Sequence, residues 1–418
     1  MKLKQFFAAA AALLIAITPT TAMAESSGFY SESELCRAVK APSETKYVNV
    51  AWNTEQAENV GVPMSWNTTA LLPIGSSLNA YSEKNGSPAG SAALFENAAS
   101  DFRGAVLGNT IVQPTETGIS VINAQTMQVT SEKSFGAPIS SDVALIDDFA
   151  YFAVQGEEYK FICANLANGL ETVWEYSSDC ALSAATDYKE YVVFAAGTKL
   201  VCCDAKTGEA VENELGFSVS GAPYAAEYAV YLSGEDGSVY KLRLNSDGTI
   251  EQDTLTPCAV GGALSSPLMW NGKVYVSSSE GFFILDSLTM EVLKSYPEMA
   301  GCTAPLVCYG NGTHVYITAP LEDYWCLYTI FDMEEFDEPQ VSKLAKLVNF
   351  EGGKVAVASD GTMYFRDAVG RLYALQVAEY SLVLIIVKLV LLLGIIVLLF
   401  LLLRKWAKDR AAARPPQY

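Results

Sequence analysis

The sequence predicts an all-β chain that folds as a β-propeller of eight blades, with seven as the alternative, and that ends in one transmembrane helix. Three observations support this expectation. Short strands of alternating polarity, rich in Val, Tyr and Phe, fill the chain after residue 45. A unit of four such strands recurs roughly every 35 to 50 residues. A long apolar stretch lies near the C-terminus.

Residues 1–24 have the composition of a cleaved signal peptide. Lys2 and Lys4 precede an apolar run from Phe6 to Ile17, and Ala22-Met23-Ala24 supplies the small residues before a cleavage site. The run is shorter than the roughly 20 residues that cross a bilayer. We therefore expect export of the chain, with an N-terminal extension over residues 25–45.

The propeller is expected over residues 46–376. Its clearest repeat begins at Ser266-Pro267, where strands are joined by Asn271-Gly272 and Glu280-Gly281, residue pairs typical of hairpin turns. Other repeats begin near the following positions: Val62-Pro63, Arg103-Gly104, Ala137-Pro138, Leu182-Ser183, Ala222-Pro223 and Thr303. Four-stranded units of this period are typical of propeller blades.

The last repeat contains only three predicted strands, over residues 354–358, 360–365 and 370–375. Residues 46–52 alternate in polarity like a strand and precede the first full repeat. A propeller closes without an exposed edge when such an N-terminal strand completes the last blade. We therefore predict closure of the ring by residues 46–52.

Residues 381–403 form an apolar stretch of 23 residues, long enough for a helix that crosses a hydrocarbon core of roughly 30 Å. The tail, residues 404–418, contains five basic residues and the single acid Asp409. The positive-inside rule places this tail in the cytoplasm and residues 25–380 outside. The expected location is the cell membrane of a bacterium, with single-pass, type I topology.

Lys388 is the only charged residue of the apolar stretch. A charge at this depth is unfavourable by a few kcal/mol unless it reaches the headgroups or is paired. Two interpretations follow, a lysine that reaches the outer headgroups and a lysine that pairs with an acidic residue of a partner's membrane helix. Lys388 is therefore a candidate contact with a membrane partner.

The charge of the predicted ectodomain is strongly negative. Without the eight basic residues and one acid of the signal peptide, helix and tail, the chain has 19 basic and 46 acidic residues, a net charge of −27. Such a surface repels nucleic acid and anionic lipid. We expect no nucleic-acid partner, and no EF-hand-like spacing of carboxylates is present.

The chain has nine cysteines, all in the predicted ectodomain. In an oxidising compartment some should be bridged, and the odd number leaves at least one without an intramolecular partner. Cys308 and Cys326 fall on strands predicted to be neighbours, and Cys258 and Cys302 lie at equivalent positions of adjacent repeats. Both pairs are candidate disulfides. No cysteines have zinc-type spacing, and the single histidine, His314, excludes a His-rich metal site.

Two motifs resemble the repeat of quinoprotein-like (PQQ-like) β-propellers. One is Asp360-Gly361 followed by Gly370-Arg371-Leu372-Tyr373-Ala374-Leu375, and the other is Cys203-Asp204-Ala205-Lys206-Thr207-Gly208-Glu209. The resemblance spans about residues 46–376 and implies the fold. The superfamily includes quinone-dependent alcohol dehydrogenases and also non-catalytic propellers, such as the lipoprotein of the outer-membrane assembly machine.

Several residues of the dehydrogenases have no match here. Those enzymes place a Trp after the Thr-Gly turn, where this chain has Glu209-Ala210-Val211-Glu212, and only Trp174 is similar. Their vicinal cysteines resemble Cys202-Cys203, but neighbouring residues of a strand point to opposite faces, which favours two ordinary strand cysteines. No calcium ligands or catalytic Asp can be assigned. His314 lies in an alternating strand, which gives no support to a Ser-His-Asp triad.

The predicted function is therefore a non-catalytic binding or scaffolding propeller, without a cofactor or metal, in a surface or envelope complex with a membrane-protein partner. One alternative is a substrate-capturing subunit of an uptake or signalling complex. The other is an oxidoreductase that uses PQQ and Ca²⁺.

Overall fold

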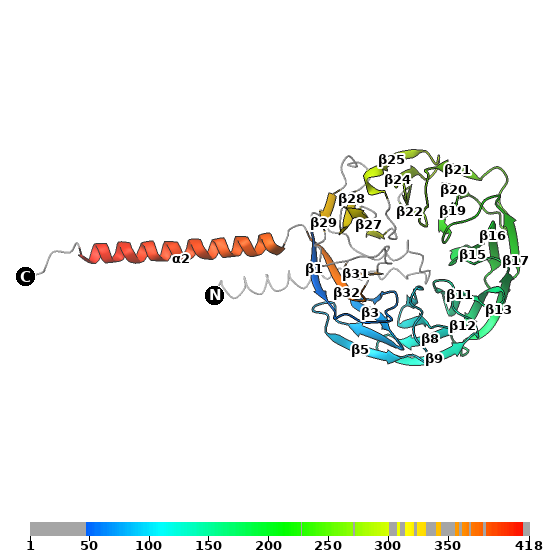
Figure 1. Ribbon diagram of the computed structural model, residues 1–418, viewed down its shortest axis with the longest axis horizontal. Helices are drawn as coiled ribbons and strands as arrows, with labels where there is room; N and C mark the ends of the chain where they lie inside the picture. The colour runs from blue at the N-terminus through cyan, green and yellow to red at the C-terminus, as the bar shows by residue number, and fades with distance from the viewer. Residues whose placement is uncertain are drawn as a thin grey trace, which may run out of the picture.

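The computed structural model describes residues 47–226, 228–270, 272–300, 307–309, 314–321, 324–331, 340–343, 356–358, 362–367, 369–378 and 382–412. Within these ranges the chain forms eight four-stranded antiparallel sheets and one long helix. The sheets stand around a ring, as Figure 1 shows. The predicted all-β propeller with one C-terminal apolar helix is confirmed. The predicted signal peptide and N-terminal extension lie outside the described residues.

Each sheet is numbered here by its place in the chain. Sheets 1 to 4 consist of β2 (Met64–Trp66), β3 (Thr69–Ile74), β4 (Ser77–Tyr81) and β5 (Pro88–Ala93); β6 (Ala105–Leu107), β7 (Thr110–Pro114), β8 (Gly118–Asn123) and β9 (Gln128–Ser134); β10 (Ala144–Ile146), β11 (Phe149–Gln155), β12 (Tyr159–Asn165) and β13 (Glu171–Ser178); and β14 (Thr186–Tyr188), β15 (Tyr191–Ala196), β16 (Lys199–Asp204) and β17 (Ala210–Glu214).

Sheets 5 to 8 consist of β18 (Tyr224–Ala226), β19 (Ala229–Ser233), β20 (Ser238–Leu242) and β21 (Thr256–Ala259); β22 (Leu268–Trp270), β23 (Lys273–Ser278), β24 (Gly281–Asp286) and β25 (Val292–Tyr296); β26 (Val307–Tyr309), β27 (His314–Leu321), β28 (Tyr324–Phe331) and β29 (Gln340–Lys343); and β30 (Ala356–Val357), β31 (Met363–Arg366), β32 (Leu372–Ala378) and β1 (Tyr47–Asn53). A short 3₁₀ helix, η2 (Pro297–Met299), follows β25.

The hydrophobic core lies between neighbouring sheets. One cluster joins sheets 3 and 4, where the rings of Phe161 and Phe194 stack with centroids 4.0 Å apart. Further clusters join sheets 8 and 1, 1 and 2, 2 and 3, and 4 and 5. The two middle strands of a sheet are apolar on both faces because each face packs on a different neighbour. The fourth strands lie at the outer edge of the ring (Figure 1) and alternate between exposed and partly buried residues, as in β9.

The last sheet contains both ends of the described propeller. β1 pairs antiparallel with β32, and Tyr47 lies opposite Ala378. Strands alternate in direction, so the first-to-second and third-to-fourth connections of every sheet lie on one face of the ring. The end of β32 and the start of β1 lie on that same face. We call it the anchor face, because the chain continues from β32 to the helix α2.

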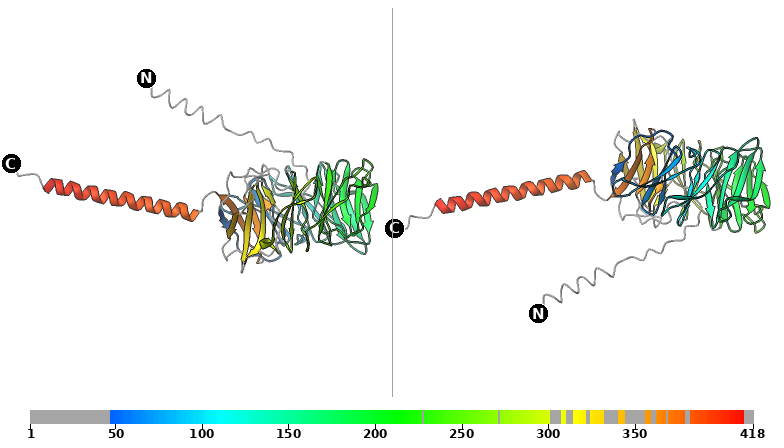
Figure 2. Two further views of the ribbon diagram at one scale, coloured as in Figure 1. Left: turned by 90° about the horizontal axis from the view of Figure 1, so that it is seen from above. Right: turned by 90° about the horizontal axis from the view of Figure 1, so that it is seen from below.

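The helix α2 spans Leu382–Ala412 and lies outside the ring (Figure 2). Within it, Ile385–Lys405 is long and apolar enough to cross a membrane, and all of its described side chains are exposed. From residue 382 on, the predicted span over 381–403 therefore belongs to a longer helix. Part of the predicted tail, through Ala412, continues this helix.

Candidate functional site

The Cys203–Glu209 motif forms the connection between the third and fourth strands of sheet 4. Asp204 Oδ1 accepts hydrogen bonds from the backbone N–H groups of Lys206 and Thr207, at 3.0 and 2.8 Å. These bonds lower the pKa of the Asp204 carboxyl, and the bond from Thr207 has the largest effect. Asp286 of sheet 6 has the same arrangement with Leu288 and Thr289. Asp204 and Asp286 therefore stabilise turns, because their carboxylates accept hydrogen bonds from backbone N–H groups.

Trp174 docks sheet 3 onto the turn of sheet 4. Its Nε1–H donates to the Ala205 carbonyl oxygen at 3.1 Å, and its ring lies against Gly208. Trp52 of β1 makes the equivalent contact with sheet 1, where it donates to the Glu83 carbonyl oxygen and lies against Gly86. Trp174, the residue singled out in the sequence, thus joins two neighbouring sheets. The docking of Trp52 was not expected from the sequence, because its partner Glu83 is 31 residues further along the chain and belongs to a turn of another sheet.

Cys202 and Cys203 face two different cores. Cys203 packs with Phe161, Trp174 and Phe194 between sheets 3 and 4, whereas Cys202 packs between sheets 4 and 5. Both thiols are free and fully buried. Burial raises the pKa of each thiol to about 12. The expectation of two ordinary strand cysteines agrees with this geometry, and neither thiol is positioned as a reactive nucleophile.

The other described cysteines differ in exposure. Cys163 is buried opposite Tyr151 in β11, and burial raises the pKa of its thiol to about 12. Cys180 is exposed, with its thiol 3.4 Å from Asp179 Oδ1, and it lies beside Gly197 at the β15–β16 turn. The hydrogen bond to Asp179 raises the pKa of the Cys180 thiol.

The predicted disulfides have different outcomes. Cys308 and Cys326 lie on β26 and β28, which both pair with β27, opposite Val315 and Ala319. The assumption that they lie on neighbouring strands was therefore wrong, because β27 separates them. Cys258 lies in the outermost strand of sheet 5 with a free thiol, and Cys302 lies outside the described residues. The Cys258–Cys302 pair stays a prediction.

His314 begins β27, and Lys388 lies in α2, three residues after Ile385. Lys388 is the seventh residue of α2, which begins at Leu382. Among the described residues, no group of three His, Cys, Asp or Glu side chains is arranged to hold a metal ion.

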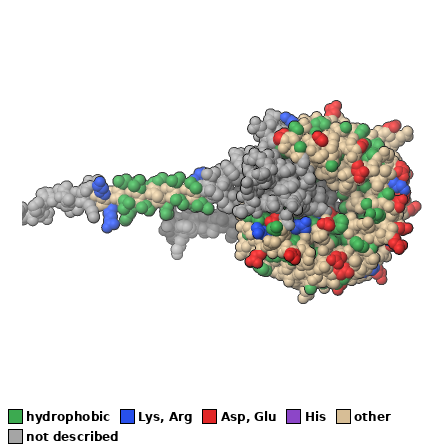
Figure 3. Space-filling view, in the orientation of Figure 1, with side chains coloured by type: hydrophobic (Ala, Val, Ile, Leu, Met, Phe, Trp, Pro, Cys, Tyr) green, Lys and Arg blue, Asp and Glu red, His purple; other side chains and the backbone are tan. Residues whose placement is uncertain are grey.

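The best candidate for a functional surface lies on the outer strands of sheets 2 to 4. Five exposed glutamates project there from β9, β13 and β17, and we call them the acidic rim: Glu132, Glu171, Glu175, Glu212 and Glu214. Figure 3 shows acidic side chains along this outer edge of the ring. Alternation on a strand with one solvated face explains why these residues point outward.

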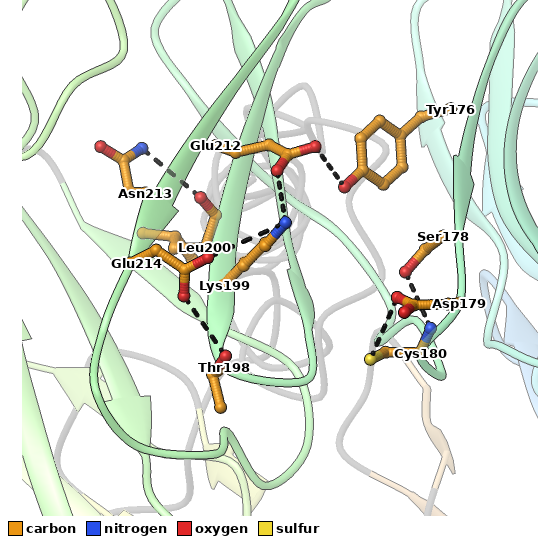
Figure 4. A network of polar contacts seen from close by, with 10 residues as sticks. All are labelled: Tyr176, Ser178, Asp179, Cys180, Thr198, Lys199, Leu200, Glu212, Asn213 and Glu214. Carbon is orange, nitrogen blue, oxygen red and sulfur yellow. Dashed lines mark hydrogen bonds and ion pairs between the residues drawn. The ribbon is translucent and has the colours of Figure 1, made fainter.

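A polar network crosses the rim between β13 and β17 (Figure 4). Lys199 Nζ lies 2.6 Å from Glu212 Oε2 and 3.8 Å from Glu214 Oε1. Tyr176 of sheet 3 donates its hydroxyl to Glu212 Oε1 at 3.0 Å, which links the two sheets. A second ion pair joins Lys160 to Glu175 at 2.8 Å. The rim is therefore acidic but internally ordered.

The network fixes the charge state of Glu212. Two hydrogen bonds lower the pKa of the Glu212 carboxyl. The bond from Lys199 has the larger effect and the bond from Tyr176 the smaller one. Glu212 in turn raises the pKa of the Lys199 ammonium. The Glu212 carboxylate is therefore stabilised in its ionised form, and carboxylate oxygens of the rim can accept hydrogen bonds and ion pairs from an approaching basic group. This arrangement suits recognition of a cationic surface.

Part of the chain matches a known protein family. A family model described as outer membrane protein assembly factor BamB matches residues 164–297. These residues extend from the end of β12 through β25, and they include sheets 4 to 6 and the strands β13 and β17 of the acidic rim. No curated protein sequence matches the chain.

Solved structures with very different sequences share the fold. A computationally designed protein, Ika8, superposes with a TM-score of 0.60 and 10% identity over 78% of this chain and 98% of its own. Quinohemoprotein alcohol dehydrogenase ADHIIG from Pseudomonas putida HK5 gives 0.59 and 9% over 85% and 81%. BamB from Moraxella catarrhalis gives 0.48 and 13% over 83% and 95%.

Proposed function

We propose that this PQQ-like repeat β-propeller is a non-catalytic protein-binding module of a surface or envelope complex, held at the outer face of the cell membrane by α2. The acidic rim is the observation that carries the proposal. The family model named after an assembly factor supports a role in binding, because it covers the strands that bear Glu175, Glu212 and Glu214. The apolar span of α2 supports anchoring, and the basic residues that follow it support a cytoplasmic C-terminus.

The proposed ligand of the rim is a basic protein surface. Within the described part of the chain, the ion pairs of β13 and β17 join two lysines, Lys160 and Lys199, to three of the four glutamates, namely Glu175, Glu212 and Glu214. The local excess is therefore negative, and it lies within an ectodomain that is negative overall. Complementary charge raises the rate of encounter and favours one orientation of the partner. The ion pairs hold the glutamates in place before the partner arrives, which reduces the entropy lost on binding.

We further propose that the folded ring has eight blades and is closed by β1. The pairing of β1 with β32 and the docking of Trp52 on sheet 1 support this closure. Closure removes the unpaired edge of β32, which is otherwise a site for association with another chain. It also brings the N-terminal end of the ring beside the point where the chain leaves for the membrane.

The proposal includes the absence of an enzymatic activity and of a bound quinone. The burial of Cys202 and Cys203 in separate cores supports the absence of a bound quinone, because neither thiol is accessible to a ligand in the ring. Titration of the purified protein with PQQ and Ca²⁺ should produce no thermal shift and no change in the quinone spectrum. A saturable shift would favour the quinone-dependent oxidoreductase instead.

The binding role is tested by photo-crosslinking on intact cells that produce the full chain. A benzophenone amino acid replaces Ser177, an exposed residue of β13 two positions after Glu175. We expect a discrete adduct with another protein, and we expect the adduct to decline as ionic strength rises.

A matched pair of variants decides whether the rim is responsible. Glu175, Glu212 and Glu214 changed together to Gln should abolish the adduct at position 177. The control changes three exposed acids elsewhere, Glu55, Glu58 and Glu251, to Gln. The control removes the same net charge and should retain the adduct. Equal loss in both variants, or no loss in the rim variant, would contradict the proposed site.

A further inference from the structure

We propose that the anchor face of the ring lies against the outer leaflet of the membrane, with Leu288 and Tyr228 in contact with lipid. This inference rests on the proposed anchoring by α2 and goes beyond it, because a tether alone does not determine which face of a ring meets the bilayer.

The topology places the anchor on one face. β32 ends at Ala378 and α2 begins at Leu382, so three residues separate the last strand from the helix. An extended chain of this length spans at most about 14 Å. The end of β32 on the anchor face must therefore remain within that distance of the start of the helix. The tether thus limits the distance between the end of β32 and the helix, and the tilt of the ring is then decided by which of its surfaces favours contact with lipid.

Exposed apolar side chains gather on the same face. In the connections between described strands, four large apolar residues are exposed, namely Leu288 (76%), Tyr228 (69%), Val369 (40%) and Leu255 (38%). Leu288 and Leu255 lie in third-to-fourth connections and Tyr228 in a first-to-second connection, which are all on the anchor face. Only Val369, in a second-to-third connection, lies on the opposite face. The most exposed apolar side chains thus project from the face that the anchor holds near the membrane.

The Leu288 turn is held by its backbone. The Leu288 N–H donates to Asp286 Oδ1 at 2.9 Å, and its carbonyl oxygen accepts a hydrogen bond from Lys241 Nζ at 2.9 Å. The backbone polar groups are thereby satisfied within the protein, and the side chain is left to face outward. A loop of this kind can enter the headgroup region without exposing unpaired backbone groups to lipid.

The chemistry of the face indicates apolar contact. Acidic residues are also present in its connections, among them Asp147, Asp148 and Asp253. Anionic lipid would repel these residues, so electrostatic attraction to the bilayer is not the source of the contact. Amphipathic aromatic side chains such as Tyr228 are favoured at the headgroup level, where the ring is buried and the hydroxyl stays wet. The proposed occupant is therefore the zwitterionic lipid surface.

Photo-crosslinking in vesicles tests the contact directly. The full chain is reconstituted in phosphatidylcholine vesicles with benzophenone placed at position 288, 228 or 369. Val369 is a matched control, because its N–H donates to Asp367 Oδ1 at 3.1 Å as that of Leu288 does to Asp286. We expect lipid adducts at 288 and 228 at least fivefold more abundant than at 369, unchanged in 1 M salt.

Two results would overturn the inference. Equal lipid labelling at 288 and 369 in carbonate-resistant protein would show that the chain is anchored but that this face is not apposed to the bilayer. Crosslinking of position 288 to a protein on intact cells, without lipid adducts, would assign the face to a protein partner. Loss of the chain from the vesicles in carbonate would instead overturn the anchoring itself, so the two failures are distinguishable.

Discussion

The indole of Trp174 lies against the α-carbon of Gly208 in the next sheet, and a side chain at Gly208 would approach the Trp174 ring to 2.5 Å. The Gly208 backbone has a φ of +74°, which L-residues rarely adopt. The glycine thus serves both the turn and the tryptophan that packs on it. Trp52 and Gly86 repeat the relationship between β1 and sheet 1.

Gly208→Ala should destabilise the propeller through two separate effects, backbone strain and displacement of Trp174. Gly216, with a φ of +79° and open space around its α-carbon, provides the control for strain alone. We expect Gly216→Ala to cost about 1 kcal/mol and Gly208→Ala to cost a further 1–3 kcal/mol. Denaturant unfolding measures the difference. Equal effects would mean that Trp174 does not pack on Gly208 in solution.

Trp52→Ala should loosen the closure between β1 and sheet 1. Trp52 is buried, lies 5.9 Å from the Tyr364 ring between centroids, and donates to the Glu83 carbonyl oxygen. Removal of a buried Trp costs about 3–5 kcal/mol. The control is Trp66→Ala, since Trp66 is only partly buried and makes one hydrogen bond, to the Gly108 carbonyl oxygen. A loss of stability no larger than that of Trp66→Ala would argue against closure by β1.

Local signals in the sequence predicted most of the fold. Residue pairs such as Asn271-Gly272 are typical of hairpin turns, so they mark where adjacent strands of one blade are joined without knowledge of the rest of the chain. Alternation likewise predicted that Cys202 and Cys203 face opposite sides of a strand. The assumption that Cys308 and Cys326 lie on neighbouring strands was wrong because adjacency depends on every intervening strand, and β27 lies between them.

The acidic rim could not be predicted as a unit. Glu175 and Glu212 belong to different sheets and are joined through Tyr176 and Lys199 only when those sheets stand side by side. Alternation along a single strand indicates at most that a glutamate faces outward on that strand. It does not show which strands meet, because that depends on packing between blades. For the same reason, the docking of Trp52 on Gly86 was not expected.

Alkaline pH should destabilise the protein through its buried thiols. The pKa values of Cys163, Cys202 and Cys203 are about 12 in the folded state, against an ordinary value near 9. Above pH 9 the unfolded state loses these protons while the folded state keeps them. Below pH 9 the thiols therefore make their full contribution to the free energy of unfolding. This contribution falls as pH rises toward 12. Each thiol contributes a loss of about 1.4 kcal/mol per pH unit in this window.

Replacement of Cys203 by Val removes one of these thiols and should flatten the alkaline decline in the free energy of unfolding. Cys180→Ser is the control, because Cys180 is exposed and contributes no buried thiol. Unfolding curves at pH 8 and pH 10.5 give the comparison. The interpretation fails if Cys203→Val and Cys180→Ser change the pH dependence equally. Thiol reagents at pH 8 should also modify Cys180 in the native protein long before Cys203.

Lys199→Met should raise the pKa of Glu212 toward its ordinary value, because the lysine is the main cause of its lowered pKa. A carboxyl with a lowered folded pKa contributes stability above its unfolded pKa, and that stability is lost as pH falls through the folded pKa. The variant should therefore lose less stability on acidification than the wild type. Carboxyl NMR titration measures the pKa directly, and Tyr176→Phe should produce a smaller shift in the same direction.

Lys388→Leu should leave both anchoring and the set of co-purifying membrane proteins unchanged. Lys388 lies six residues after Leu382, the first residue of α2, about 9 Å along the helix axis from that end. A lysine side chain of that depth reaches the headgroups by extending toward the helix start. Purification in mild detergent followed by mass spectrometry compares the partners of both forms, with Leu389→Ile as the control. Selective loss of one membrane protein from Lys388→Leu would instead show that Lys388 pairs with an acidic residue of that partner.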